Sequence, residues 1–134
     1  MDGIHLLGEF YGCPADTPYM LDAGALRSAC LQAVEAAGLT SVGDRFHQFE
    51  PHGVTGAVIL AESHLAIHTW PELGAVTLDV YVCNFTTDNS AKAQALYDAL
   101  EEQFAPARSN FQVIARGGVK PKPARVREAR EVAS

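Results

Sequence analysis

The chain has little positive charge and no long apolar run. Its 134 residues carry 10 lysines and arginines against 16 aspartates and glutamates, for a formal net charge of -6. Binding to nucleic acid or to an anionic membrane surface requires a basic footprint, so this balance argues against both roles. No apolar segment approaches the roughly 18 residues of a membrane span. The opening "MDGIHLLGEFYG" lacks the pattern of a signal peptide.

Cysteine is also scarce. Cys13, Cys30 and Cys83 are odd in number and widely spaced, with no C-x-x-C pair among them. A disulfide framework or a structural zinc site needs paired or closely spaced cysteines. We therefore expect reduced thiols in a cytoplasmic protein, and no metal site.

The chain does have enough apolar residues for one compact domain, because 48% of its residues are hydrophobic and 19% are charged. After Asp22, apolar residues recur every three or four positions, which predicts a helix that ends at Gly38. A second amphipathic stretch predicts a helix over 90–104, with Asp88 or Asn89 near its cap. Alternating and β-branched segments predict strands over 3–11, 39–49, 54–61, 65–70, 75–83 and 109–116, and residues 13–21 read as a loop.

This order of elements predicts an α+β fold. We expect a two-layer α/β sandwich, in which an antiparallel sheet carries two helices on one face and leaves the other face for a partner. From Gly117 onward the segment "GGVKPKPARVREAREVAS" loses apolar content and gains Pro, Lys and Arg. The predicted organisation is therefore one domain over 1–116 and a loose tail over 117–134.

The segment "AESHLAIHTWPE" (61–72) places reactive side chains between two apolar strands. His64 and His68 are four residues apart, but in a strand that spacing separates them by about 13 Å. One metal ion therefore cannot bind both. Ser63 lacks the G-x-S-x-G elbow of a hydrolase nucleophile. Cys83, at the end of an apolar strand, is by itself typical of a buried structural thiol.

Taken together and in order, these residues resemble a known family. Glu62-Ser63-His64, then His68-Thr69-Trp70-Pro71-Glu72, and Cys83 beyond them resemble the processing and active-site segment of S-adenosylmethionine decarboxylases of the short prokaryotic class. The likeness extends upstream through "HLLGEFYGC" and "FHQFEPHGVTG", so it covers roughly residues 3 to 85.

The resemblance implies a proenzyme that cuts itself between Glu62 and Ser63. In this family the serine hydroxyl attacks the preceding carbonyl to give an ester, and elimination followed by hydrolysis leaves a covalent pyruvoyl group derived from the serine. His68 matches the histidine that acts as base, and Thr55 lies where many relatives carry a serine that supports processing. The pyruvoyl cofactor forms a Schiff base with the substrate amine and accepts electrons as carbon dioxide leaves.

The remaining matches concern turnover and substrate. Cys83 matches the proton donor to the substrate carbon, Glu72 the acid that binds ribose hydroxyls, and Phe49 an aromatic that stacks on adenine. These matches predict a carboxy-lyase that converts S-adenosylmethionine to the aminopropyl donor for spermidine, and hence polyamine, biosynthesis. The resemblance also implies a homodimer of cleaved protomers, two α and two β chains, with active sites shared between them.

Two alternatives stay open at the level of sequence. A pyruvoyl-dependent L-arginine or L-ornithine decarboxylase could use Glu72, Glu9 or Glu50 to pair with the distal cation of its substrate. A non-catalytic, unprocessed partner subunit is disfavoured because Ser63, His68 and Cys83 are all present. One departure from the expected pattern follows the cysteine, where the chain reads "NFTTDN" in place of an immediate glycine.

Overall fold

The computed structural model describes residues 2–84, 88–117 and 130–133. Its elements, in chain order, are β1 (Asp2–Tyr11), α1 (Pro18–Leu21), α2 (Ala23–Ala36), β2 (Ser41–Gln48), β3 (Val54–Leu60), β4 (His64–Trp70), the 3-10 turn η1 (Pro71–Leu73), β5 (Ala75–Cys83), α3 (Ser90–Phe104), β6 (Arg108–Gly117) and β7 (Arg130–Ala133). The six predicted strands and both long helices are confirmed. The predicted loop over 13–21 is wrong at its end, because α1 forms there, and Pro18 suits the first turn of a helix, where no N–H is needed.

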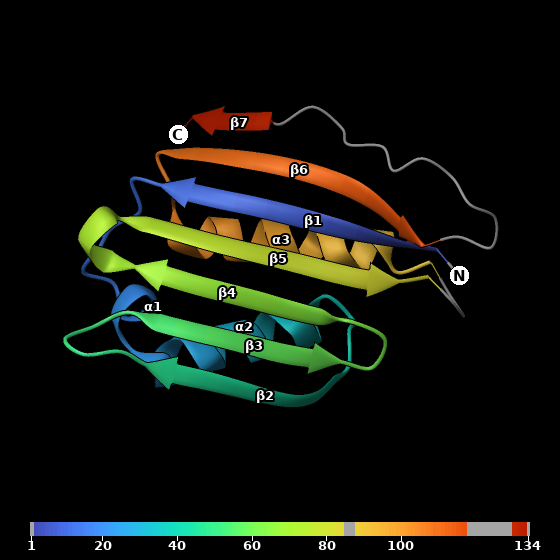
Figure 1. The fold of residues 1–134 in the computed structure, drawn as a ribbon, viewed down its shortest axis with the longest axis horizontal. Helices are drawn as coiled ribbons and strands as arrows, with labels where there is room; N and C mark the ends of the chain where they lie inside the picture. The colour runs from blue at the N-terminus through green and yellow to red at the C-terminus, as the bar shows by residue number, and fades with distance from the viewer. Residues whose placement is uncertain (1, 85–87, 118–129, 134) are drawn as a thin grey trace.

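The strands form one antiparallel sheet in the order β2-β3-β4-β5-β1-β6-β7. Figure 1 shows α2 and α3 packed behind this sheet, so that the near face carries no helix. The two-layer α+β architecture predicted from the sequence is therefore confirmed. None of the helices in the described residues combines the length and apolarity of a membrane crossing.

The core lies between the sheet and the helices. Alternate residues of the central strands point toward α2 and α3 and are fully buried, among them Leu6, Phe10, Leu65, Ile67, Val76 and Val80. Tyr97 of α3 approaches β1 at Gly8, where an added Cβ would lie 2.4 Å from the Tyr97 hydroxyl oxygen. The absence of a side chain at Gly8 is thus what lets this aromatic ring pack against the sheet.

The two long helices begin differently. The Asp22 carboxylate accepts a hydrogen bond from the Ala25 N–H at 2.8 Å, which confirms it as the cap of α2. At the start of α3, the side chain of Asn89 makes no capping hydrogen bond. Asp88 instead accepts from the Ser90 N–H at 2.9 Å. The side chain of Asn89 is therefore directed elsewhere.

The predicted tail, 117–134, falls mostly outside the described residues. Within it, Gly117 ends β6, and Arg130–Ala133 form β7, which pairs with β6 from Arg108 to Phe111. These four residues form a strand where loose chain was expected. The boundary between a domain of 1–116 and a tail stays a prediction.

The helix-free face of the sheet is mixed in character. It carries the side chains that alternate with the core, including His5, Glu9, His68, Thr77 and Asp79. Three large apolar side chains, Phe49, Ile59 and Trp70, are 47%, 49% and 38% exposed on or beside this face. A protein surface packed against this face would cover these three side chains.

Candidate active site

The Glu62–Ser63 bond lies in a tight hairpin at one end of the sheet. The Leu60 N–H donates to the Ser63 carbonyl at 2.9 Å, and the Ser63 N–H donates to the Leu60 carbonyl at 3.3 Å. Leu60 and Ser63 therefore face each other across the turn, with Ala61 and Glu62 at its tip. The Ala61 N–H also donates to the Thr40 carbonyl at 3.0 Å, which fixes the hairpin against the preceding segment.

Ser63 and Cys83 are brought together at this end. The main-chain N–H of Cys83 donates to Ser63 Oγ at 3.2 Å. Because the oxygen accepts this bond through a lone pair, its own hydrogen can be given to another acceptor. Asn89 lies beside them and donates from Nδ2 to the Cys83 carbonyl at 2.9 Å and to Glu62 Oε2 at 3.1 Å. We call Glu62, Ser63, Cys83 and Asn89 the serine group.

A second cluster is built on the paired strands β3 and β4. Thr55 lies opposite His68 in the register, and its Oγ1 is 3.0 Å from His68 Nδ1. The His68 ring stacks on Trp70, with ring centroids 5.8 Å apart and an interplanar angle of 29°. These two contacts fix the orientation of the imidazole. We call Thr55, His68, Phe49 and Glu72 the histidine group.

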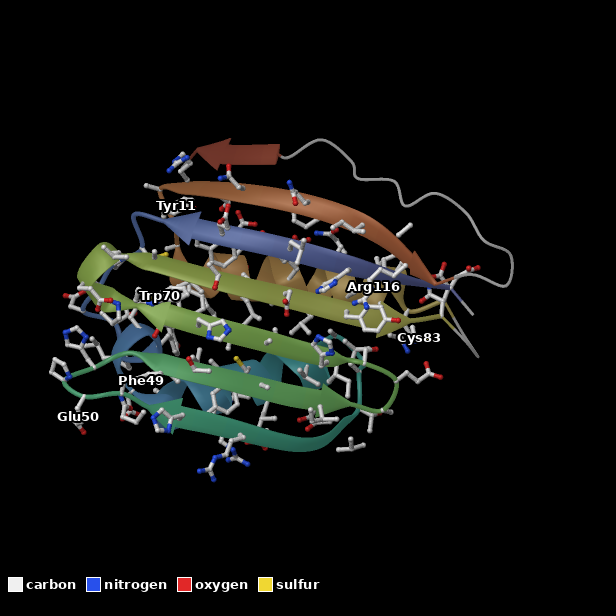
Figure 2. All side chains as sticks on the ribbon, viewed as in Figure 1. Tyr11, Phe49, Glu50, Trp70, Cys83 and Arg116 are labelled. Carbon is white, nitrogen blue, oxygen red and sulfur yellow. The ribbon has the colours of Figure 1, made fainter. Side chains whose placement is uncertain are left out.

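Phe49 and Glu72 extend the histidine group toward the edge of the sheet. Phe49 follows β2, and its ring packs edge-on against His47 with centroids 4.6 Å apart. Glu72 lies in η1 after β4, with its side chain 55% exposed and Oε2 4.0 Å from His52 Nδ1. Figure 2 shows Phe49 and Trp70 toward one end of the strands and Cys83 at the other.

Within a single chain, the serine group and the histidine group lie far apart. Ser63 and His68 are five residues apart along extended chain, a separation of about 16 Å at 3.3 Å per residue. Neither side chain is long enough to close that distance. The structure therefore joins Ser63 with Cys83, and Thr55 with His68, but it separates the nucleophile from the base that the sequence predicted for it.

Beside His68 the helix-free face holds a hollow of about 390 Å³, lined among others by Leu7, Glu9, His68, Thr77, Asp79 and Gln112. Its walls combine apolar groups with carboxylates and amides from β1, β4, β5 and β6. This composition can receive a polar small molecule or the side chains of a facing protein surface.

His64 lies near His5 and Asp79, with ligand atoms of the three side chains all within 4.8 Å of one another. Arg116 Nη1 donates to His5 Nδ1 at 3.2 Å, which places the imidazole proton on Nε2, 3.5 Å from Asp79 Oδ2. Metal binding by His5 Nε2 would therefore require loss of this proton. Burial lowers the pKa of His5, although Asp79 opposes this shift; Arg116 adds to it.

Comparison with known proteins places the chain among the decarboxylases. The family model described as S-adenosylmethionine decarboxylase matches residues 4–117. The chain therefore belongs to the S-adenosylmethionine decarboxylase family, as its resemblance predicted.

Relatives support this membership along nearly the whole chain. An S-adenosylmethionine decarboxylase proenzyme of Aquifex aeolicus is 42% identical over 118 residues, covering 88% of this chain and 83% of its own. One of Archaeoglobus fulgidus is 39% identical, covering 86% and 97%. The crystal structure of the adenosylmethionine decarboxylase from Aquifex aeolicus superposes with a TM-score of 0.80 at 39% identity, over 90% of this chain and 94% of that one.

A more distant structure shares the fold alone. The Trypanosoma brucei AdoMetDC-delta26 monomer matches with a TM-score of 0.60 at 17% identity, over 83% of this chain and 45% of that chain.

Proposed function

We propose that this chain is a self-processing, pyruvoyl-dependent decarboxylase that converts S-adenosylmethionine to its decarboxylated aminopropyl donor. The observation that carries the proposal is the hairpin, in which Ser63 follows Glu62 and its hydroxyl accepts from the Cys83 N–H at 3.2 Å. The related chains named above are described as proenzymes, which agrees with a precursor that is cut.

Processing needs only side chains of this protein, from one copy or two, together with one water. The Ser63 Oγ–C bond to the Glu62 carbonyl forms, the Glu62–Ser63 C–N bond breaks, and the hydroxyl proton passes to the nitrogen, which gives an ester. A base then removes the Ser63 α-proton as the Cβ–Oγ bond breaks, so Glu62 leaves with a carboxylate. Hydrolysis of the remaining dehydroalanine gives the pyruvoyl group and ammonia.

The serine group fits this cofactor. The pyruvoyl group supplies an electron sink for decarboxylation when it is present at position 63. Cys83 lies next to that position in the sheet, so its thiol can give a proton to the substrate carbon that loses carbon dioxide. Cys83 is buried, with 6% of the residue exposed, and water is therefore largely kept from that proton transfer.

The base must come from elsewhere, because His68 of the same chain lies about 16 Å from Ser63. A second copy packed face to face would provide it. If the two-fold axis runs between the sheets and across the strands, it places the serine group of one protomer opposite the histidine group of the other. The exposed Phe49, Ile59 and Trp70 favour such a homodimer of cleaved protomers.

The substrate assignment rests on the histidine group and on the relatives. Phe49 offers an exposed aromatic face for adenine, and Glu72 an exposed carboxylate for ribose hydroxyls. The relatives reported above carry S-adenosylmethionine decarboxylase names, and none of them favours arginine or ornithine.

All three cysteines are free thiols, which supports the cytoplasmic location expected from the sequence.

Intact-mass measurement of the purified protein tests the proposal. We expect a fragment of residues 1–62 and a second fragment that begins at a modified, Edman-resistant Ser63. Labelled carbon dioxide should be released from carboxyl-labelled S-adenosylmethionine and not from arginine or ornithine. An uncut chain without decarboxylation would contradict the processing mechanism, and release from a basic amino acid alone would contradict only the substrate.

A further inference from the structure

Asn89 links the residue before the cleaved bond to the strand that holds the attacking serine. Its side chain is buried, with 7% of the residue exposed, at the start of α3. A side-chain amide has two N–H donors. Asn89 directs Nδ2 at the Cys83 carbonyl, 2.9 Å away, and at Glu62 Oε2, 3.1 Å away.

These contacts close a ring around the Glu62–Ser63 bond. The main chain of Cys83 holds the attacking oxygen through its N–H, which donates to Ser63 Oγ. Through its carbonyl, the same residue holds the Asn89 amide, which in turn holds the Glu62 carboxylate. The attacking oxygen and the side chain of the residue that carries the attacked carbonyl are therefore both linked to the main chain of Cys83.

The position of Asn89 is itself fixed by hydrogen bonds. Asn84 Oδ1 accepts from the Asn89 N–H at 2.8 Å, and Asn84 Nδ2 donates to Ser90 Oγ at 3.2 Å. Asn84 is the residue that stands where a glycine was expected after the cysteine. Asparagine is a preferred helix cap, yet Asn89 makes no capping bond with its side chain, and Asp88 bonds the Ser90 N–H instead.

We propose that Asn89 is a positioning residue for self-cleavage. The inference rests on the proposed function, because it concerns the first step of processing. That step requires Ser63 Oγ to lie close to the Glu62 carbonyl carbon, and the rate of an intramolecular attack depends strongly on this alignment. By holding the Glu62 side chain, Asn89 restricts rotation of the hairpin loop and keeps that carbonyl in reach.

The variant Asn89→Asp tests the side-chain N–H donor of Asn89, because it replaces the amide with a carboxylate of nearly the same size. Its carboxylate would face the Glu62 carboxylate, and we expect the cleavage half-time at about pH 8 to lengthen roughly tenfold. As pH falls, a proton shared between the two carboxyls restores a hydrogen bond, so cleavage relative to the wild type should recover. Circular dichroism at both pH values checks that the variant stays folded, so that the change is one of cleavage and not of the fold.

Glu62→Ala removes the same contact from the other side and leaves α3 untouched. If Asn89 acts through Glu62, the double variant Glu62→Ala with Asn89→Ala should cleave no more slowly than the slower single variant. Asp88→Ala is the matched control, since it removes a hydrogen bond at the start of the same helix without contact to Glu62. It should cleave at the wild-type rate.

The outcomes separate this inference from the proposed function. A wild-type chain that never cuts at Glu62–Ser63 would overturn both. A wild-type chain that cuts normally, together with a Glu62→Ala variant that cuts equally fast, would overturn the role of Asn89 alone. The cleavage rate of Glu62→Ala tests the role of Asn89 even if the Asn89 variants fail to fold. Circular dichroism would reveal such a failure.

Discussion

Thr55 Oγ1 and His68 Nδ1 lie 3.0 Å apart across strands β3 and β4. The bond can run either way, and its direction decides what His68 can do. If Nδ1 donates to the threonine, Nε2 carries a lone pair and can accept a proton. A base at this position therefore depends on Thr55 as an acceptor.

This dependence makes a prediction for Thr55. Thr55→Ser keeps the acceptor and should process at close to the wild-type rate. Thr55→Val keeps the shape but removes the oxygen, and should slow processing about tenfold, the effect of losing one oriented hydrogen bond. The time course of the two fragments on a denaturing gel measures this. Equal rates for the two variants would remove Thr55 from the mechanism.

A mixing experiment tests whether the site is shared between subunits. Ser63→Ala and His68→Ala should each stay uncut as homodimers. In hybrids, Ser63 of the His68→Ala chain meets His68 of the partner subunit, so about half of the His68→Ala chains should be cut after random pairing of equal amounts. Co-expression with two different tags and intact-mass analysis measures this fraction. Hybrids that stay whole would argue for sites confined to one chain.

Cys83→Ala should separate processing from turnover. The hydrogen bond to Ser63 Oγ comes from the main-chain N–H of residue 83, which alanine retains. Fragments should therefore still form. The carbon left by decarboxylation must be protonated before the next turnover, so loss of the donor should lower steady-state carbon dioxide release by roughly 10²–10⁴-fold. Release measured on fully processed protein checks this, and unchanged turnover would exclude the thiol as donor.

Gly8→Ala should destabilise the fold without touching either group of site residues. The new methyl group would lie 2.4 Å from the Tyr97 hydroxyl oxygen in the core. Overpacking of this kind costs about 1–3 kcal/mol of the free energy of unfolding. Gly43→Ala is the matched control, because nothing lies within 4 Å of an added Cβ there. Urea denaturation of both variants compares them, and an equal loss would refute the packing argument.

His5 should make the fold sensitive to mild acid. Its pKa is lowered from 6.5 mainly by burial, so the folded state favours the neutral ring. The stability associated with this shift is present above pH 6.5 and is lost as pH falls through the folded pKa. Asp79→Asn removes a contribution that raises the pKa, and should lower it further. NMR titration of the ring measures both values, and His5→Gln should abolish this part of the pH dependence.

Much of the fold could be read from local patterns. The alternation in 75–83 and the three- and four-residue spacing after Asp22 each reflect one strand or helix burying one face, a property that neighbouring residues encode. The short helix at Pro18–Leu21 was missed, because a single turn carries too little periodicity to distinguish it from a loop.

The arrangement of the site was harder to predict from local sequence patterns. The order of Glu62, Ser63, His68 and Cys83 along the chain sufficed to indicate the family and its chemistry. It gave no sign that Asn89 reaches Glu62, since that contact joins residues 27 positions apart. Nor did it show that His64 would lie near His5 and Asp79, which belong to other strands of the sheet.

The two long helices, the six main strands and the reactive groups could be predicted from residue type and spacing alone, because each reflects a local pattern. Tertiary structure decided which of those groups meet. The pairing of β4 with β3 places Thr55 beside His68, and its pairing with β5 brings Cys83 to Ser63. The physical reason is the rise of an extended strand. Ser63 and His68 are only five positions apart in the sequence, yet extended chain keeps them about 16 Å apart. Residues from distant segments that pair across neighbouring strands lie only about 5 Å from each other.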